Sequence, residues 1–402
     1  MPLSKKHRFS LTIAALLLTL VACMPFGFLK DPPETMQTQS VGSNTLPLNL
    51  KWQVHTDDPI RFRPYALDGM VLIKTSTQDC AFCRASKAKL IALDAVSGEK
   101  LWESSFTGLF NDISPISFND LIIFPINADT SLRAVSKETG EAVWETVLSE
   151  NMDSLIHDDK YVFVSSDIDP STVYAIDPTS GKIVWENSKD IPIRSRSVLS
   201  LDDGKLVSVF DTRVLVFEPK TGRLVRQTPA NLPAFDAPMY QDGKAFFNPE
   251  KGIWAINVDS GQAIWAFEPD CIKDGNENEG QKRLGRYFLY APSVLQATVY
   301  VTGGCKSVFA LDAETGQLKW TYKSDNVGTM SHLLVIDMLG YVLFRDGSIR
   351  AIDLHTGQEK GRAITTFVPF ANFPSNQGLA TWINMLYVTF GGRTVLAFGQ
   401  KP

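Results

Sequence analysis

The chain has 402 residues, of which 44% are hydrophobic and 21% charged, the proportions of an ordinary folded globular protein that buries a large core. Its length would suggest two or three domains, although rings and repeats can run longer as one domain. The formal net charge of −5 argues against a nucleic-acid partner, which requires a basic stripe on the protein.

The N-terminus has the features of an export signal. Two lysines and an arginine precede a mostly apolar run at residues 11–22, and Cys23 follows. The run is too short to cross a bilayer as a helix but suits the apolar region of a signal peptide. Ala22-Cys23 resembles the bacterial lipobox, in which the Cys becomes the lipidated first residue of the mature chain.

We therefore predict a lipoprotein signal peptide at residues 1–22 and a lipid anchor on Cys23. The protein would be exported and held on a bacterial membrane, on the periplasmic or outer cell-surface side. An ordinary cleaved signal, or an uncleaved anchor that happens to contain a Cys, is the alternative. Residues 23–47 contain many Pro, Gln, Ser and Thr residues without an apolar period, which predicts a flexible tether.

One sequence phrase then recurs along the chain. Its first copy, Leu90–Trp102, joins alternating apolar residues to an Asp, a Gly and a Trp. A degenerate copy of the phrase has Val225 in place of the Trp. Five of the six steps between the turn glycines are 39–42 residues, which is typical of four-stranded propeller blades, and the step of 55 residues contains an insertion. These glycines are Gly98, Gly140, Gly181, Gly222, Gly261, Gly316 and Gly357.

Each residue of the phrase has a structural role to fill. The alternating residues form a strand, the Asp or Asn caps the turn N–H groups, and the Gly supplies a positive φ. The broad Trp ring suits a position between neighbouring blades. We expect these tryptophans to pack blades together and not to form a cofactor site. They are Trp52, Trp102, Trp144, Trp185, Trp265 and Trp320.

The two ends of the repeat complete each other. Residues 394–398 form a third strand with no fourth strand after it, and residues 49–55 form a fourth strand with no third before it. We predict an all-β fold: an eight-bladed propeller of four-stranded antiparallel blades over residues 48–402, closed by the N-terminal strand pairing with the C-terminal blade. Seven blades with one stray strand is the alternative.

These phrases resemble the PQQ-like repeat, with its Ala-x-Asp-x-x-Thr-Gly-Lys-x-x-Trp pattern, over about residues 49–400. One branch of that family comprises quinoprotein dehydrogenases, which hold pyrroloquinoline quinone and calcium on the ring axis. The other comprises BamB-type outer-membrane assembly lipoproteins, which share a lipobox, a similar length and closure by an N-terminal strand. The dehydrogenases are longer and carry a disulfide between adjacent cysteines, and this chain has no adjacent cysteine pair.

Four further cysteines lie in or beside two long insertions, residues 76–88 and 269–286. An exported chain meets an oxidising compartment, so we predict the disulfides Cys271–Cys305 and Cys80–Cys83. A thioredoxin-type pair or half of a zinc site is the alternative for the second pair, but strands flank it and no second pair lies near.

No catalytic, cofactor-binding or metal-binding residue is predicted. The four histidines beyond the leader fall in different blades, and no nucleophile elbow, P-loop or His-Glu-x-x-His motif occurs. The acidic loop 274–280 lacks the Gly and Glu that a calcium loop needs at its sixth and twelfth positions.

The sequence therefore favours a non-enzymatic, protein-binding envelope scaffold, with outer-membrane protein assembly as the role that the resemblance implies. A quinone-dependent dehydrogenase and a sensor of small ligands or carbohydrates are the alternatives. Both insertions fall on the face formed by the connections from the second to the third strand and from one blade to the next. Because loops vary freely on a rigid ring, we expect envelope partners to bind that face.

Overall fold

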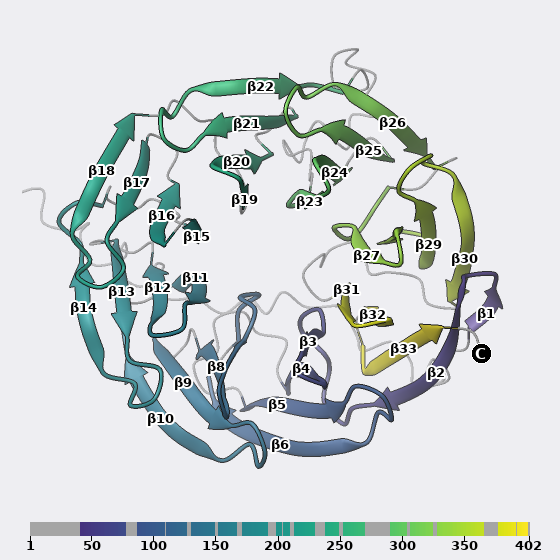
Figure 1. The fold of residues 1–402 in the computed structure, drawn as a ribbon. Helices are drawn as coiled ribbons and strands as arrows, with labels where there is room; N and C mark the ends of the chain where they lie inside the picture. The colour runs from purple at the N-terminus through teal and green to yellow at the C-terminus, as the bar shows by residue number, and fades with distance from the viewer. Residues whose placement is uncertain are drawn as a thin grey trace, which may run out of the picture. The chain divides into compact units, whose positions relative to one another are not determined.

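The computed structural model shows a ring of eight small sheets (Figure 1). The described residues form strands only, all within the unit Ser40–Pro402. Among them, none belongs to a helix with the length and apolar character needed to cross a membrane. The structure describes residues 41–77, 87–108, 110–126, 130–148, 152–166, 171–191, 198–202, 204–209, 213–229, 238–248, 252–269, 290–303, 306–324, 328–365, 377–390 and 392–400.

Each of the first four blades has four antiparallel strands, ordered from the inside of the ring outward (Figure 1). Blade 1 contains β3 (Tyr65–Leu67), β4 (Met70–Ser76), β5 (Lys87–Asp94) and β6 (Lys100–Thr107). Blade 2 contains β7 (Ile116–Phe118), β8 (Leu121–Ile126), β9 (Ser131–Ser136) and β10 (Ala142–Val147). Blade 3 contains β11 (Met152–His157), β12 (Val162–Ser166), β13 (Thr172–Ile176) and β14 (Ile183–Asn187). Blade 4 contains β15 (Val198–Asp202), β16 (Lys205–Val209), β17 (Arg213–Phe217) and β18 (Leu224–Pro229).

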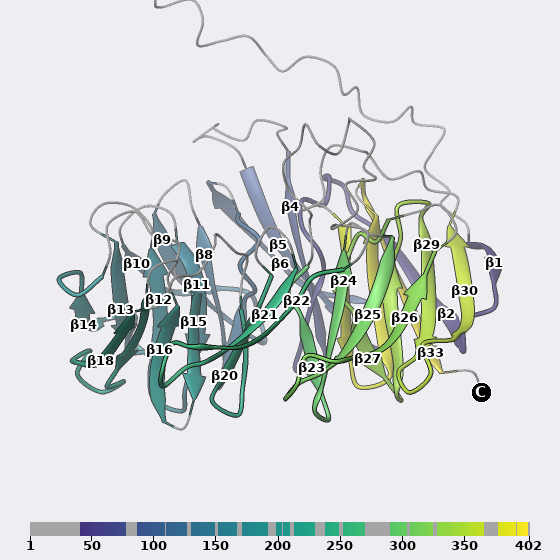
Figure 2. The same cartoon turned by 90° about the horizontal axis from the view of Figure 1, so that it is seen from above.

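The remaining four blades complete the ring (Figure 1), which Figure 2 shows turned by 90°. Blade 5 contains β19 (Met239–Gln241), β20 (Lys244–Phe247), β21 (Ile253–Asn257) and β22 (Ala263–Phe267). Blade 6 contains β23 (Ser293–Leu295), β24 (Thr298–Gly303), β25 (Ser307–Asp312) and β26 (Leu318–Lys323). Blade 7 contains β27 (Leu334–Ile336), β28 (Leu339–Leu343), β29 (Ser348–Asp353) and β30 (Glu359–Thr365), with β1 (Val41–Asn44) outside them. Blade 8 contains β31 (Gln377–Trp382), β32 (Met385–Phe390), β33 (Thr394–Gln400) and β2 (Leu48–His55).

The eighth blade joins the two ends of the described chain. β2 pairs antiparallel with β33, and the register places Trp52 opposite Ala397 and Val54 opposite Val395. The predicted eight-bladed propeller and its closure by an N-terminal strand are confirmed. Closure gives each of these strands a partner and removes two exposed sheet edges.

Six of the eight blade interfaces have the same contact. The Trp on the outer strand of one blade lies over the turn glycine of the next, where an added Cβ would approach the indole to 2.3–2.7 Å. The indole N–H also donates to a backbone carbonyl of that next blade at 2.8–3.1 Å. The six pairs are Trp52–Gly98, Trp102–Gly140, Trp144–Gly181, Trp185–Gly222, Trp265–Gly316 and Trp320–Gly357.

The residue before each turn holds the turn closed. Asp94 Oδ1 accepts hydrogen bonds from the N–H groups of Val96 and Ser97 at 3.0 and 2.7 Å, and these bonds lower the pKa of its carboxyl. Gly98, which follows Ser97, takes up the left-handed conformation with φ of 76°. The repeated Asp and Gly therefore present a flat turn on which an indole can lie.

The interface between blades 4 and 5 lacks this contact. The register of β17 with β18 places Arg226, and not Val225, at the position that holds Trp in other blades. The alignment of Val225 with the tryptophans was therefore wrong by one residue, and the Val225 side chain is 51% exposed. Gly261 of blade 5 faces Thr228 and Pro229 instead of a ring.

The interface between blades 7 and 8 is filled by the N-terminal segment. Gly361 takes the Trp position opposite Ala351, and a Cβ there would lie 2.1 Å from the carbonyl oxygen of Thr45. Leu46, which is fully buried, packs in the core between the two blades. The predicted tether at residues 23–47 therefore differs from the structure at its end, because Val41–Asn44 forms β1; residues 23–40 lie outside the described part.

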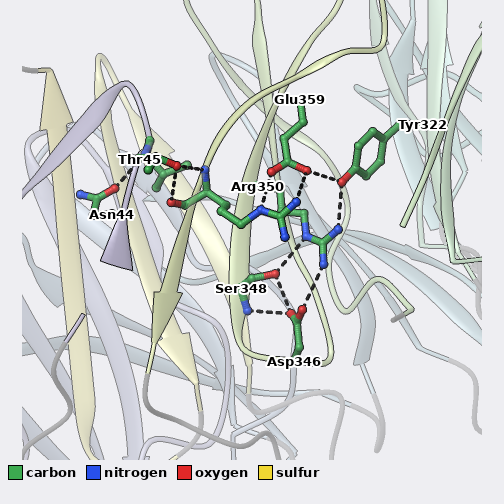
Figure 3. A network of polar contacts seen from close by, with 9 residues as sticks. Asn44, Thr45, Tyr322, Asp346, Ser348, Arg350 and Glu359 are labelled. Atoms are coloured by element: carbon green, nitrogen blue, oxygen red, sulfur yellow. Dashed lines mark hydrogen bonds and ion pairs between the residues drawn. The ribbon is translucent and has the colours of Figure 1, made fainter. Parts of the chain in front are cut away.

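Polar contacts fasten this segment to blade 7 (Figure 3). The N–H of Thr45 donates to the carbonyl of Arg362 at 2.8 Å, and the N–H of Arg362 donates to the Thr45 hydroxyl at 3.0 Å. The Arg362 guanidinium pairs with Glu359, which accepts from the hydroxyl of Tyr322 on blade 6. The segment is thus bonded to blade 7, and Glu359 of that blade is in turn bonded to blade 6.

Two glycine-to-alanine variants distinguish the stability that comes from the indole contact from the stability that comes from the turn conformation. Gly140 and Gly204 both have positive φ, 72° and 68°, but only Gly140 lies under an indole. Both alanine variants carry the left-handed strain of about 1–2 kcal/mol, and overpacking against Trp102 adds about 1–3 kcal/mol in Gly140→Ala. Urea unfolding should show the larger loss for Gly140→Ala, and equal losses would contradict the stacking role.

Candidate functional site

The face on which partner binding was predicted carries residues that the structure describes only in part. Most of both insertions, 76–88 and 269–286, lies outside the described residues. So do Cys80, Cys83, Cys271 and Cys305, and also Cys23. The two disulfides and the lipid anchor stay predictions. The described residues of this face instead present a polar cluster that the sequence analysis did not single out.

Lys74 is the centre of that cluster. It lies on β4 near the blade end that faces the insertions, and its side chain is fully buried. Its ammonium group donates to the carbonyl oxygens of Asn111 and Ile113 at 3.0 and 2.7 Å. Both carbonyls belong to the connection from blade 1 to blade 2, so Lys74 fixes the path of that connection. Burial lowers the pKa of Lys74 to about 7.

Three aromatic rings surround the same ammonium group. The Nζ atom lies 5.7, 4.7 and 5.4 Å from the ring centroids of Phe62, Tyr65 and Phe110. Ring faces attract a cation, which offsets part of the cost of burying it. Because these groups enclose Lys74 completely, it has no access to a substrate and acts as a positioning residue.

Two charged residues beside this enclosed group, Arg63 and Asp112, are partly accessible to solvent. The Tyr65 hydroxyl donates to Asp112 Oδ1 at 3.1 Å, and Arg63 Nε lies 3.7 Å from the same oxygen. Arg63 also donates to the Ser114 hydroxyl at 3.2 Å. The side chains of Arg63 and Asp112 are 30% and 53% exposed. Removal of water by the surrounding protein nevertheless raises the pKa of the Asp112 carboxyl and the pKa of the Tyr65 hydroxyl.

The cluster extends to the inner strands of blades 7 and 8. A Cβ on Gly378 of β31 would lie 2.6 Å from Arg63 Cβ, so blade 8 contacts Arg63 directly. His332 precedes β27 of blade 7, and burial together with repulsion by Arg63 lowers its pKa to about 3. His332 is therefore neutral at physiological pH. The cluster presents a fixed arginine, a carboxylate and a neutral imidazole, which suits hydrogen bonding to a polar partner.

One signal in the sequence pointed to this cluster. The apolar strand Val71-Leu-Ile-Lys-Thr contains a charged residue at an inward position, and a buried lysine requires partners. The groups that surround Lys74 come from residues up to 12 positions before it and from residues more than 35 positions after it. No local pattern in the sequence reveals that these residues meet. No group of three or more His, Cys, Asp or Glu side chains able to hold a metal occurs in the part of the chain that the structure describes.

Two family models match the chain. One, described as outer membrane protein assembly factor BamB, matches residues 49–165 and 169–274. The other, described as the β-propeller domain of glucose/ethanol/alcohol dehydrogenase, matches residues 236–335.

The relatives found by sequence are distant. Outer membrane protein assembly factor BamB of Yersinia pestis is 23% identical over 261 residues, which cover 60% of this chain and 64% of that protein. The match thus spans less than two thirds of that relative. An uncharacterized protein of Rickettsia conorii is 21% identical over 291 residues, or 65% of this chain and 67% of that protein.

Solved structures share the fold. BamB from Moraxella catarrhalis superposes with a TM-score of 0.62 at 16% identity, over 88% of this chain and 98% of that one. Quinohemoprotein alcohol dehydrogenase from Comamonas testosteroni superposes with a TM-score of 0.60 at 12% identity, over 90% of this chain and 78% of that one. At these identities the likeness shows the propeller fold and no activity.

The buried lysine makes the stability of the protein depend on pH. Lys74 titrates near pH 7 when folded and near pH 10.4 when unfolded, so the unfolded chain binds more protons between these values. Relative to Lys74→Met, the free energy of unfolding of the natural protein should rise from pH 7 to pH 10, by up to about 1.4 kcal/mol per pH unit. Below pH 7 the difference should be constant.

Urea unfolding of both proteins at several pH values measures this difference. Lys51→Met, which removes an exposed lysine from β2, is the matched control and should leave the pH profile unchanged. Parallel profiles for the natural protein and Lys74→Met would contradict the assignment.

Proposed function

This chain belongs to the PQQ-like-repeat propeller family whose model is described as outer membrane protein assembly factor BamB, and on that premise we propose that it is a non-enzymatic scaffold that binds other proteins of the cell envelope. The finer role proposed is a part in outer-membrane protein assembly. The protein would be anchored through Cys23 and would present its ring to partners on the periplasmic or outer side of the membrane.

The family match is the observation that carries this proposal. It extends over residues 49–165 and 169–274, which include the closing strand β2 and blades 1 to 5. The BamB of Yersinia pestis is named as an outer membrane protein assembly factor, and its match reaches over more than half of this chain. The matched part is β2 and five blades of the ring, a rigid support that suits a protein whose task is to hold partners.

The face that bears the insertions is the proposed binding face. Lys74 fixes the connection from blade 1 to blade 2 beneath this face, so Asp112 and Ser114 occupy defined positions at the surface. Arg345, in the turn that joins the second and third strands of blade 7, is exposed on the same face. Charged and polar groups held on a rigid support give an interface specificity and steer association.

Crosslinking in intact cells tests the choice of face. A photo-reactive amino acid at Ser114 or Arg345 should trap an envelope protein as a discrete higher-mass product. The matched positions Val96 and Ile383 lie in turns at the opposite face and are 68% and 69% exposed. They should give no such product, because the proposed partner covers the other end of the ring.

Mass spectrometry of the trapped product identifies the partner. Equal trapping from both faces would remove the basis for assigning one binding face. A complete absence of products at Ser114 and Arg345, with the protein present at normal levels, would count against the scaffold function.

The lipid anchor is tested separately. Cys23→Ser removes the thiol that would carry the diacyl group, and each buried methylene of such chains contributes about 0.8 kcal/mol to membrane binding. Fractionation should find the variant in the soluble fraction and the natural protein in the membrane fraction. If both proteins remain equally in the membrane fraction, the anchor lies elsewhere.

A second candidate function, quinone-dependent dehydrogenation, is favoured by the match of residues 236–335 to a dehydrogenase propeller. Among the described residues, no group of three or more His, Cys, Asp or Glu side chains could hold the calcium that the family's dehydrogenases carry. Quinone absorbance and dye-linked alcohol oxidation by the purified protein would favour this function over the scaffold.

A further inference from the structure

Among the described residues, the interface between blades 4 and 5 has neither an indole lying on a glycine turn nor an inserted backbone segment. Six other interfaces have the first feature, and the interface between blades 7 and 8 has the second. Arg226 stands at the Trp position of blade 4, opposite Val216. The outer part of this interface is therefore built differently from the rest of the ring.

Arg226 reaches the next blade with its charged end. Its Nη2 atom donates to the carbonyl of Val258 at 3.4 Å and lies 2.5 Å from Asp259 Oδ1. The indoles of the other interfaces donate to the equivalent carbonyl at 2.8–3.1 Å, so the hydrogen bond of the guanidinium is longer. The side chains of Arg226 and Asp259 are 34% and 72% exposed. Ion pairs that are exposed to this degree contribute little to stability, because water and salt screen them.

Opposite charges face each other across this interface. A half-open depression of about 300 Å³ lies over it. Blade 4 lines the depression with Lys205 and Arg226, and blade 5 lines it with Asp242 and Asp259. The attraction between these groups draws the two blades together and weakens as the salt concentration rises. An indole contact between blades has no such dependence, since screening acts on charges.

The inner part of the same interface is apolar and closed. Val207, Val216 and Val258 are 2%, 1% and 2% exposed, and they pack with Val214 and Phe247 in one core cluster. The closed ring is therefore the ground state. The interface consists of a buried apolar interior behind an outer contact that salt weakens.

We propose that the ring opens locally between blades 4 and 5, and that the ionic strength of the surroundings sets how often it opens. The opening separates the two blades at the charged outer contact, while the strands within each blade stay paired. It is a property of the ring alone, so it does not depend on the scaffold function. Opening would move the two blades relative to each other at the end of the ring where partner binding is proposed, and salt would thereby alter that face.

Two valines at the same position of the repeat provide matched probes of opening. Val214 on β17 packs in the interface between blades 4 and 5, and Val173 on β13 packs in the interface between blades 3 and 4. Both are fully buried, and each lies two residues before the residue that pairs with Arg226 or Trp185. A cysteine at either position can react with iodoacetamide only while its interface is open or the whole chain is unfolded.

Iodoacetamide labelling of Val214→Cys and Val173→Cys in the full chain measures this opening, and peptide mass spectrometry distinguishes the introduced thiol from the natural cysteines. We expect Val214→Cys to react at least about fivefold faster than Val173→Cys. Raising sodium chloride from about 0.1 M to about 1 M shortens the Debye length from about 10 to about 3 Å. This change should raise the rate of Val214→Cys about two- to fivefold and leave the rate of Val173→Cys unchanged.

A restored indole should close the interface. In the Val214→Cys protein, the added changes Val216→Ala and Arg226→Trp recreate the alanine and tryptophan that pair in other blades, such as Ala175 and Trp185. Labelling should then slow to the rate of Val173→Cys and lose its dependence on salt.

A single charge change tests the proposal even where the restored row does not fold. Asp259→Asn, added to Val214→Cys, removes the carboxylate that Arg226 contacts and should bring the labelling rate at low salt close to the rate at high salt. The matched control Glu145→Gln breaks the ion pair with Arg133 within blade 2 and should leave the labelling of Val214→Cys unchanged.

Two results would overturn the proposal. Equal labelling rates of Val214→Cys and Val173→Cys would mean that both thiols are reached only by unfolding of the whole chain. A rate of Val214→Cys that neither salt nor Asp259→Asn changes would refute the control of opening by ionic strength.

Discussion

The ring depends on one contact, an indole laid flat on a glycine turn of the next blade. A single four-stranded sheet of this size would expose both of its faces to water. The indole of one blade and the glycine turn of the next therefore stabilise the protein only when they meet. Joined, the indole buries its surface and its N–H finds a carbonyl at 2.8–3.1 Å. Six of the eight interfaces between neighbouring blades are made this way, and they join the sheets into the ring.

The two interfaces that lack the Trp show how the same space can be used differently. Between blades 7 and 8 the Trp position is Gly361, and the backbone of Thr45 occupies the room that the missing side chain leaves. The chain can enter the ring there because no side chain competes with it. Between blades 4 and 5, Arg226 stands at the Trp position and donates to the carbonyl of Val258 in the next blade, as an indole does elsewhere. One departure from the repeat thus serves closure, and the other keeps the contact between blades with a charged side chain.

Rigidity also bears on the proposed binding face, at the end of the ring that carries the insertions. Lys74 is costly to bury, yet it is held by two carbonyls of the connection between blades 1 and 2 and by three aromatic rings. Its effect is to keep that connection in one conformation. Asp112 and Ser114 are then presented without a large loss of loop entropy on binding, which favours specific contacts with a partner.

The repeated phrase by itself determined the class of fold, the number of blades and the way the ring closes, because each copy carries the local chemistry of a strand, a turn and a packing ring. The two half-blades at residues 49–55 and 394–398 were visible as fragments that complete each other. The spacing of four residues from turn glycine to Trp also puts Arg226 and Gly361 at Trp positions. Only the tertiary structure decided what contacts those positions make and where the buried lysine finds partners. It placed Thr45 beside Gly361, and Lys74 among groups from separate connections. These contacts join residues far apart in the chain, and their energies depend on burial that no local pattern encodes.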